Sequence, residues 1–117
     1  NNERPHVSNV CNFTPPTATK PSLLTFNEVT TLFHEFGHGL HGMLANTTYP
    51  SLSGTSVARD YVEFPSQLLE HWLATPEVLN KFALHYKTNE PLSQSLVERL
   101  LKSSIPMQKV DLFSPMD

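Results

Sequence analysis

Residues 34–38 read His-Glu-Phe-Gly-His, the pattern HExxH. On a helix, two histidines four residues apart project from the same face, so His34 and His38 can bind one metal ion together. Glu35 lies about 100° around the helix from His34, where it can reach a water at the metal without competing as a ligand. The pattern predicts a zinc-dependent hydrolytic site with Glu35 as its general base.

A catalytic zinc site needs a third protein ligand and one open position. Glu63 follows His38 by twenty-five residues and lies in the first turn of a second predicted helix, so we predict it as that ligand. His41 lies one turn beyond His38, but three ligands from one straight helix spread along its axis. We therefore place His41 in the cleft or behind the ligands, or as a structural histidine. The longer pattern HExxHxxGxxH is excluded, because Leu44 occupies its last position.

A histidine that binds a metal usually donates a hydrogen bond from its other ring N–H to a residue outside the ligand set. Asp60 and Gln67 share a helical face with Glu63 and Glu70, and Thr30 precedes His34 by one turn. Asp60, Gln67 and Thr30 are therefore candidates for this role. The alternative is helix capping by Asp60 and solvent exposure of the others.

The elements that must position these residues are mostly helical. An apolar stripe spaced by three and four residues predicts a helix from Thr25 or Asn27 to Leu44, with Asn27 as a plausible N-cap. The stripe is expected to pack inward, opposite the histidines, and it comprises Phe26, Val29, Phe33, Phe36, Leu40 and Met43. Further helices are predicted over 60–74, 75–86 and 93–103, the last ended by Pro106, and a short strand over 7–13.

Size and charge restrict the partners. The chain has 117 residues, a formal net charge of −3 and no basic run, so neither nucleic acid nor a membrane surface is an expected partner. Cys11 is the only cysteine, which favours a reducing, cytoplasmic compartment. A peptidase with a substrate cleft is usually much larger, so residues 1–117 are interpreted as part of the catalytic domain of a longer protein.

Several segments resemble one family of zinc peptidases. TLFHEFGH at 31–38, LSGT at 52–55 and RDYVEFPSQ at 59–67 are similar to the thimet oligopeptidase family. VCNFT at 10–14 and EHW at 70–72 are similar to its bacterial peptidyl-dipeptidase, or dipeptidyl carboxypeptidase, branch. The resemblance covers residues 7–104, whereas residues 105–117 depart from the family pattern.

The resemblance implies a mainly helical catalytic-domain fragment with a short extended or β segment at its N-terminus. It implies one Zn²⁺ held by His34, His38 and Glu63, and hydrolysis of short peptides with release of C-terminal dipeptides. It also implies that residues 10–13 can pair with an extended substrate. Two alternatives stay open: an endo-acting oligopeptidase, and a zinc-binding fragment that lacks the catalytic parts supplied by the rest of the parent chain.

Overall fold

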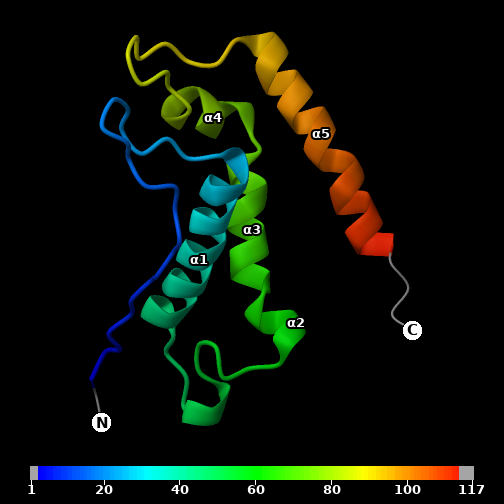
Figure 1. Cartoon of the computed structure of the whole chain (residues 1–117). Coiled ribbons are helices and arrows are strands. Elements are labelled where there is room, and N and C mark those ends of the chain that lie inside the picture. The colour runs from blue at the N-terminus through cyan, green and yellow to red at the C-terminus, as the bar shows by residue number, and fades with distance from the viewer. Residues whose placement is uncertain (1–2, 114–117) are drawn as a thin grey trace. The chain divides into compact units, whose positions relative to one another are not determined.

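About half of the chain is helical, and the rest of the described residues form extended segments, turns and loops. The computed structural model describes residues 3–113, with side chains described through residue 103. The chain consists of two compact units, Asn1–Leu73 and Ala74–Asp117. The first contains α1 (Phe26–Leu44), the short 3-10 helix η1 (Pro50–Leu52), α2 (Arg59–Val62) and α3 (Phe64–Leu73), and the second contains α4 (Pro76–Phe82) and α5 (Gln94–Phe113) (Figure 1). The predicted mainly α class is confirmed.

Helix α1 begins slightly earlier than the predicted cap would allow. The side-chain oxygen of Thr25 accepts a hydrogen bond from the backbone N–H of Glu28 at 3.2 Å, so Thr25 is the N-cap. Asn27, the predicted cap, already lies in the first turn. Thr25 is therefore three residues before Glu28, as in a capping box, and the Glu28 carboxylate has its strongest hydrogen bonds with Thr14.

An extended segment runs along α1 in the opposite direction, and we call residues 3–14 the strap (Figure 1). At one end, the N–H and hydroxyl of Thr14 donate to the Glu28 carboxylate, with an N to Oε2 distance of 3.1 Å. At the other end, the Arg4 guanidinium donates to the carbonyls of Met43 and Ala45. The predicted strand over 7–13 is wrong, because no neighbouring strand pairs with the strap in the described part of the chain.

The contact between Thr14 and Glu28 should make the free energy of unfolding depend on pH. The two hydrogen bonds from Thr14 lower the pKa of Glu28 below its ordinary value. A carboxyl group whose pKa falls on folding stabilises the folded state above its unfolded pKa, and this contribution disappears as the pH falls through the folded pKa. We expect Thr14→Val to lose part of the acid-dependent fall in unfolding free energy. Urea titrations of both proteins from neutral to acidic pH test this, and parallel curves would contradict it.

Glycines let two segments approach the α1 backbone. A Cβ atom on Gly37 would lie 2.5 Å from Ser66 Cα and 2.7 Å from the Pro65 carbonyl oxygen, so α1 and α3 touch at backbone level. A Cβ atom on Gly39 would instead meet the Asn9 side chain of the strap at 3.3 Å. The glycines thus serve helix packing at Gly37 and strap packing at Gly39.

We expect Gly37→Ala to destabilise the fold. Alanine favours helix by up to about 1 kcal/mol over glycine, but here its methyl group must push two backbones apart, which typically costs about 1–3 kcal/mol or more. Gly39→Ala is the matched control, because the atom that it meets belongs to a flexible side chain. Thermal unfolding should show a clear loss for Gly37→Ala alone. Equal melting temperatures would contradict the close packing.

The predicted helix over 60–74 is divided in two at Glu63. Pro65 has no backbone N–H and cannot continue the hydrogen-bond ladder of α2. Glu63 takes φ −83° and ψ −7° as the C-cap of α2, and its carbonyl accepts from Gln67 N at 3.0 Å in the first turn of α3. The break places Glu63 at a junction rather than within a helix.

The second unit differs from prediction at both helices. Helix α4 ends at Phe82 rather than near Tyr86, and the chain then turns back, with an isolated antiparallel bridge between Leu84 and Pro91. Helix α5 continues through Pro106, the predicted stop, to Phe113. An interior proline normally kinks or ends a helix, because it removes one hydrogen bond, but the backbone remains helical here.

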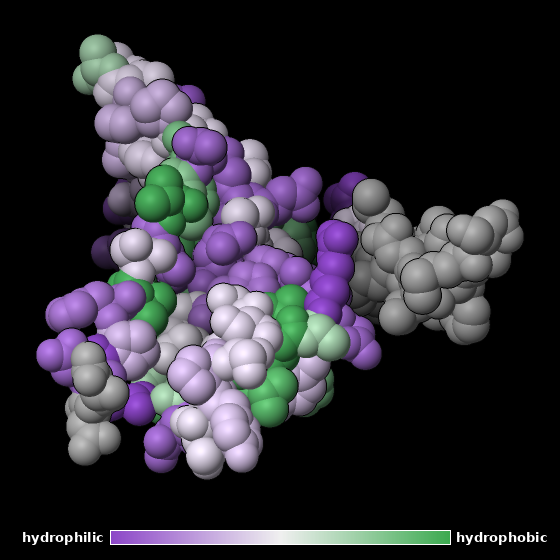
Figure 2. All heavy atoms as spheres, turned by 90° about the horizontal axis from the view of Figure 1, so that it is seen from below, coloured by the Kyte–Doolittle hydropathy of each residue, from purple (hydrophilic) through white to green (hydrophobic). Residues whose placement is uncertain are grey.

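Few apolar side chains are buried. Leu69 and Leu73 are buried in the first unit, and Leu79 and Val97 in the second, whereas Phe36 of the predicted inward stripe is 48% exposed. The prediction that α1 packs inward through this stripe is wrong at its contact with α3, because α3 packs against Gly37 and not against Phe36. Figure 2 shows apolar side chains as separate green patches among polar ones. None of the helices in the described residues is long and apolar enough to cross a bilayer.

Candidate metal centre

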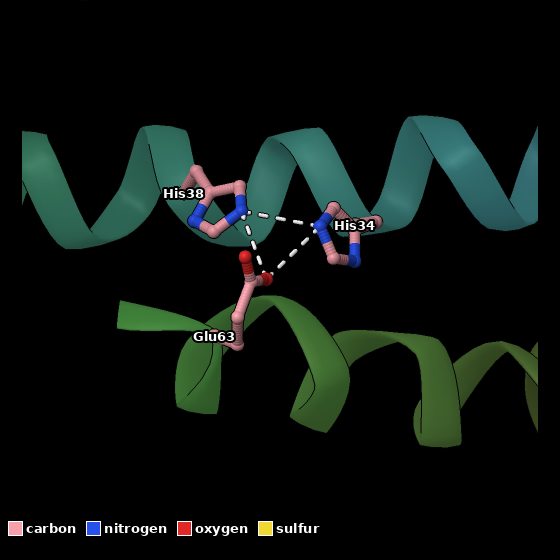
Figure 3. A group of neighbouring side chains, drawn as sticks. All are labelled: His34, His38 and Glu63. Carbon is pink, nitrogen blue, oxygen red and sulfur yellow. Dashed lines mark hydrogen bonds and ion pairs between the residues drawn. The ribbon is translucent and has the colours of Figure 1, made fainter. Parts of the chain in front are cut away.

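Three potential metal ligands converge between α1 and the α2–α3 junction. His34 Nε2 lies 3.1 Å from His38 Nε2 and 3.2 Å from Glu63 Oε2, and His38 Nε2 lies 3.3 Å from the same oxygen (Figure 3). The described residues contain no other group of three histidine, cysteine or acidic side chains with this arrangement. The structure thus brings together the three residues that the sequence predicts as ligands.

The spacing of these atoms suits a small tetrahedral ion. Zinc binds nitrogen and oxygen at about 2.0–2.2 Å, which puts tetrahedral ligand atoms about 3.3–3.6 Å apart. The three observed distances, 3.1, 3.2 and 3.3 Å, lie at or up to about 0.2 Å below the lower end of this range. Calcium prefers six to eight oxygen ligands at longer distances, so two imidazoles argue against it. The donor set fits zinc and leaves a fourth position for water.

The Ser66 hydroxyl contacts the Glu63 carboxylate and favours its ionised form. This fully buried hydroxyl lies 2.9 Å from the Glu63 carbonyl oxygen and 2.9 Å from Oε2, and donates to them. This side-chain hydrogen bond is the main cause that lowers the pKa of Glu63. Desolvation opposes it less strongly, and the nearby charges of His38, His34 and Arg59 lower the pKa further. Glu63 is therefore kept ionised, as a metal ligand must be.

Glu70 orients His34. The His34 Nδ1–H donates to Glu70 Oε1, two turns after Glu63 on the same side of the α2–α3 segment. A carboxylate on Nδ1 fixes the tautomer, leaves the Nε2 lone pair free for a metal and raises its basicity. The sequence contains a signal for this role, because Glu70 shares a helical face with Glu63, but the same signal favours Asp60 and Gln67 equally.

The three residues predicted for this role lie elsewhere. The Thr30 hydroxyl donates back to the Phe26 carbonyl at 2.9 Å, as helical threonines often do. Asp60 Oδ1 accepts from the Tyr61 N–H at 2.9 Å in the first turn of α2, and Gln67 is exposed. None of these contacts joins them to a ligand histidine, so Glu70 has the role considered for them.

We expect Glu70→Ala to weaken zinc binding without removing a ligand. Loss of an outer carboxylate typically lowers metal affinity or activity about 10–100-fold. Glu70→Gln keeps the size and one acceptor oxygen, so it should fall between alanine and wild type. Competition with a chromophoric chelator measures the affinities. Wild-type affinity in Glu70→Ala would mean that the contact does not support the ligand.

His38 and His41 each have a buried nitrogen that lacks an acceptor. Nδ1 of both rings has no hydrogen-bond partner within the described residues. The His41 ring instead meets the Tyr61 ring edge-on, with centroids 5.9 Å apart. His41 thus lies outside the three-ligand group, beside Tyr61 of α2.

A cleft of about 1380 Å³ opens at two of the three ligands, His38 and Glu63. Glu35, His38 and Glu63 line it together with residues 3–9 of the strap and part of the loop over 46–56. Gly54 in that loop has φ +56°, where glycine is favoured, and its backbone comes close to Gly42 Cα of α1. Glu35 therefore lies in a space that a small molecule or peptide can enter, beside the ligands and not among them.

Comparison with known proteins identifies similar chains. The family model described as Peptidase family M3 matches residues 1–116. The chain is 48% identical over 105 residues to dipeptidyl carboxypeptidase of Salmonella typhimurium, an alignment that covers 90% of this chain and 15% of that protein. It is 52% identical over 99 residues to thimet-like oligopeptidase of Dictyostelium discoideum, covering 83% and 15%.

A third relative is mitochondrial intermediate peptidase of Botryotinia fuckeliana, 44% identical over 99 residues, with 83% of this chain and 13% of that protein covered. The chain spans about 15% or less of the length of these curated relatives.

Proposed function

Because the chain belongs to peptidase family M3, we propose that it carries the zinc-binding catalytic segment of a metallopeptidase that hydrolyses short peptides. His34, His38 and Glu63 are the proposed ligands of one Zn²⁺. The observation that carries the proposal is the triangle of two imidazole nitrogens and one carboxylate oxygen, with sides of 3.1–3.3 Å, at the end of a cleft.

The proposed chemistry assigns a separate task to each acidic residue. When bound, zinc supplies a Lewis acid that polarises the scissile carbonyl and makes water more acidic. Glu35 takes a proton from the attacking water as the water oxygen bonds to the carbonyl carbon. Glu35 then delivers that proton to the amine nitrogen as the carbon–nitrogen bond breaks. Glu70 holds His34 in the ligand orientation, and Ser66 keeps Glu63 ionised.

Release of C-terminal dipeptides is the proposed mode of cleavage. Dipeptidyl carboxypeptidase of Salmonella typhimurium supports it, at 48% identity, whereas thimet-like oligopeptidase of Dictyostelium discoideum favours the second candidate, an endo-acting oligopeptidase. A peptide with a blocked C-terminus separates the two. A dipeptidyl enzyme should cleave it poorly, and an endo-acting enzyme should cleave it as well as the free peptide.

Zinc content and hydrolysis, measured together, test the proposal. Elemental analysis of the purified chain should give one zinc per molecule, and a quenched fluorescent peptide reports cleavage. One zinc with cleavage supports the whole proposal. One zinc without cleavage supports a zinc-binding segment that needs further parts of a longer protein. Absence of zinc after refolding with the metal contradicts the ligand assignment in this chain.

A further inference from the structure

Arg4 is a cation at the cleft without an acidic partner. Its guanidinium donates to the carbonyls of Met43 and Ala45, the latter at 2.9 Å from Nη1, and it forms no ion pair with any described side chain. These carbonyls lie at the C-terminal end of α1, whose dipole compensates only part of the guanidinium charge. Arginine has five N–H donors, so three remain for another acceptor.

The other charged groups that line the cleft are acidic. Glu3, Glu35 and Glu63 line it, and Arg4 is the one permanently charged cation among the lining residues, all of which lie within the described part of the chain. A carboxylate that enters the cleft therefore meets one fixed positive charge, that of Arg4, and three acidic side chains. Guanidinium groups bind carboxylates with two parallel hydrogen bonds, which gives such a site its preference.

The contacts of Arg4 lie beyond the ligands along α1. It donates to the carbonyls of Met43 and Ala45, which follow His34 and His38 by five to eleven residues. A peptide whose scissile carbonyl lies at the ligands, and whose chain continues toward the C-terminal end of α1, brings its C-terminal carboxylate toward Arg4.

The direction of the strap agrees with this placement. Residue 14 lies at the start of α1 and residue 4 at its end, so the strap and α1 run in opposite directions. Residues 5–9 line the cleft, and their main chain makes no backbone–backbone hydrogen bond to any other described residue. A peptide that pairs with it antiparallel has its C-terminal end beside Arg4.

We propose that Arg4 binds the C-terminal carboxylate of a peptide substrate and so determines how far from that end the scissile bond lies. This inference rests on the proposed function, because it places the scissile bond at the zinc ligands. It assigns to Arg4 a second task besides holding the end of α1.

The test compares a free carboxylate with an amide. An uncharged five-residue peptide and its C-terminal amide are titrated into the Glu35→Gln chain, which prevents hydrolysis, and binding is followed by NMR. The free acid should bind about tenfold more tightly than the amide, as expected for a charge-assisted hydrogen-bonded pair. Arg4→Gln should abolish this difference, and Arg4→Lys should keep part of it.

A second variant controls for the strap. Thr14→Val weakens the other anchor of the strap but leaves Arg4 in place, so it should keep the acid-to-amide ratio even if both affinities fall. Equal binding of acid and amide by the parent chain, or a preference that survives Arg4→Gln, overturns the proposal.

The same ratio is measured with zinc and after chelation. The Arg4 contribution should survive chelation, because the guanidinium does not need the metal. A chain that fails to bind zinc but retains the preference contradicts the proposed function and supports the Arg4 site. A chain that binds zinc and shows no preference supports the zinc ligands and overturns the Arg4 site.

Discussion

Replacing Glu35 with Gln should abolish peptide hydrolysis while one zinc ion remains bound. Glutamine keeps the size and polarity of the side chain but cannot accept the proton of the attacking water. General acid–base catalysis typically contributes about 10²–10⁴-fold to a rate, so a loss of that size is expected. Glu35 lines the cleft and belongs to no ligand set within the described residues, so the metal site should be unaffected.

Turnover of a quenched fluorescent peptide and zinc content are measured on the same preparation, for the variant and for a wild-type protein that shows hydrolysis. Glu77→Gln, at an exposed acidic position of α4, is a control for the loss of one negative charge. Turnover near the wild-type rate in Glu35→Gln would assign the general base to another residue. Loss of zinc would mean that Glu35 supports the metal site as well.

Glu63→Ala should weaken zinc binding far more than Asp60→Ala. Glu63 Oε2 lies 3.2 and 3.3 Å from the two histidine nitrogens, so its loss removes one of three protein ligands. The affinity should fall by more than the roughly 10–100-fold that accompanies loss of an outer partner. Asp60 only accepts a hydrogen bond from the adjacent Tyr61 N–H, so Asp60→Ala should bind zinc almost as tightly as wild type.

Chelator competition gives both affinities, and circular dichroism shows whether each variant keeps its helices. Equal losses in two folded variants would mean that the third ligand has been misplaced. A loss confined to Glu63→Ala would support the assignment independently of any catalytic assay.

The candidate site could be predicted from the sequence better than the elements around it. The spacing of His34 and His38 follows directly from helix geometry, and one acidic helix start supplied Glu63. The outer partner was ambiguous, because acceptors at 60, 67 and 70 share one helical face and periodicity cannot rank them. Only the contact between Glu70 and the Nδ1 atom of His34 on α1 identifies Glu70 as this partner.

Local signals failed where long-range packing decides. Apolar periodicity suggested that α1 packs through Phe36, but the backbone contact at Gly37 brings α3 to the other side. The strap has the composition of a strand, yet no partner strand lies beside it in the described residues. Which capping residue is used, Thr25 or Asn27, depends on local geometry that propensity does not resolve.

The two anchors of the strap have a consequence for the solution conditions in which the cleft keeps its shape. Arg4 and Glu28 are each half of a charge-dependent contact near the surface, one at each end of α1. Mobile ions weaken such contacts, since at 1 M salt charges are screened beyond about 3 Å. One wall of the cleft is therefore tied by contacts that ionic strength can loosen, whereas the ligand triangle is built on helix packing that salt leaves intact.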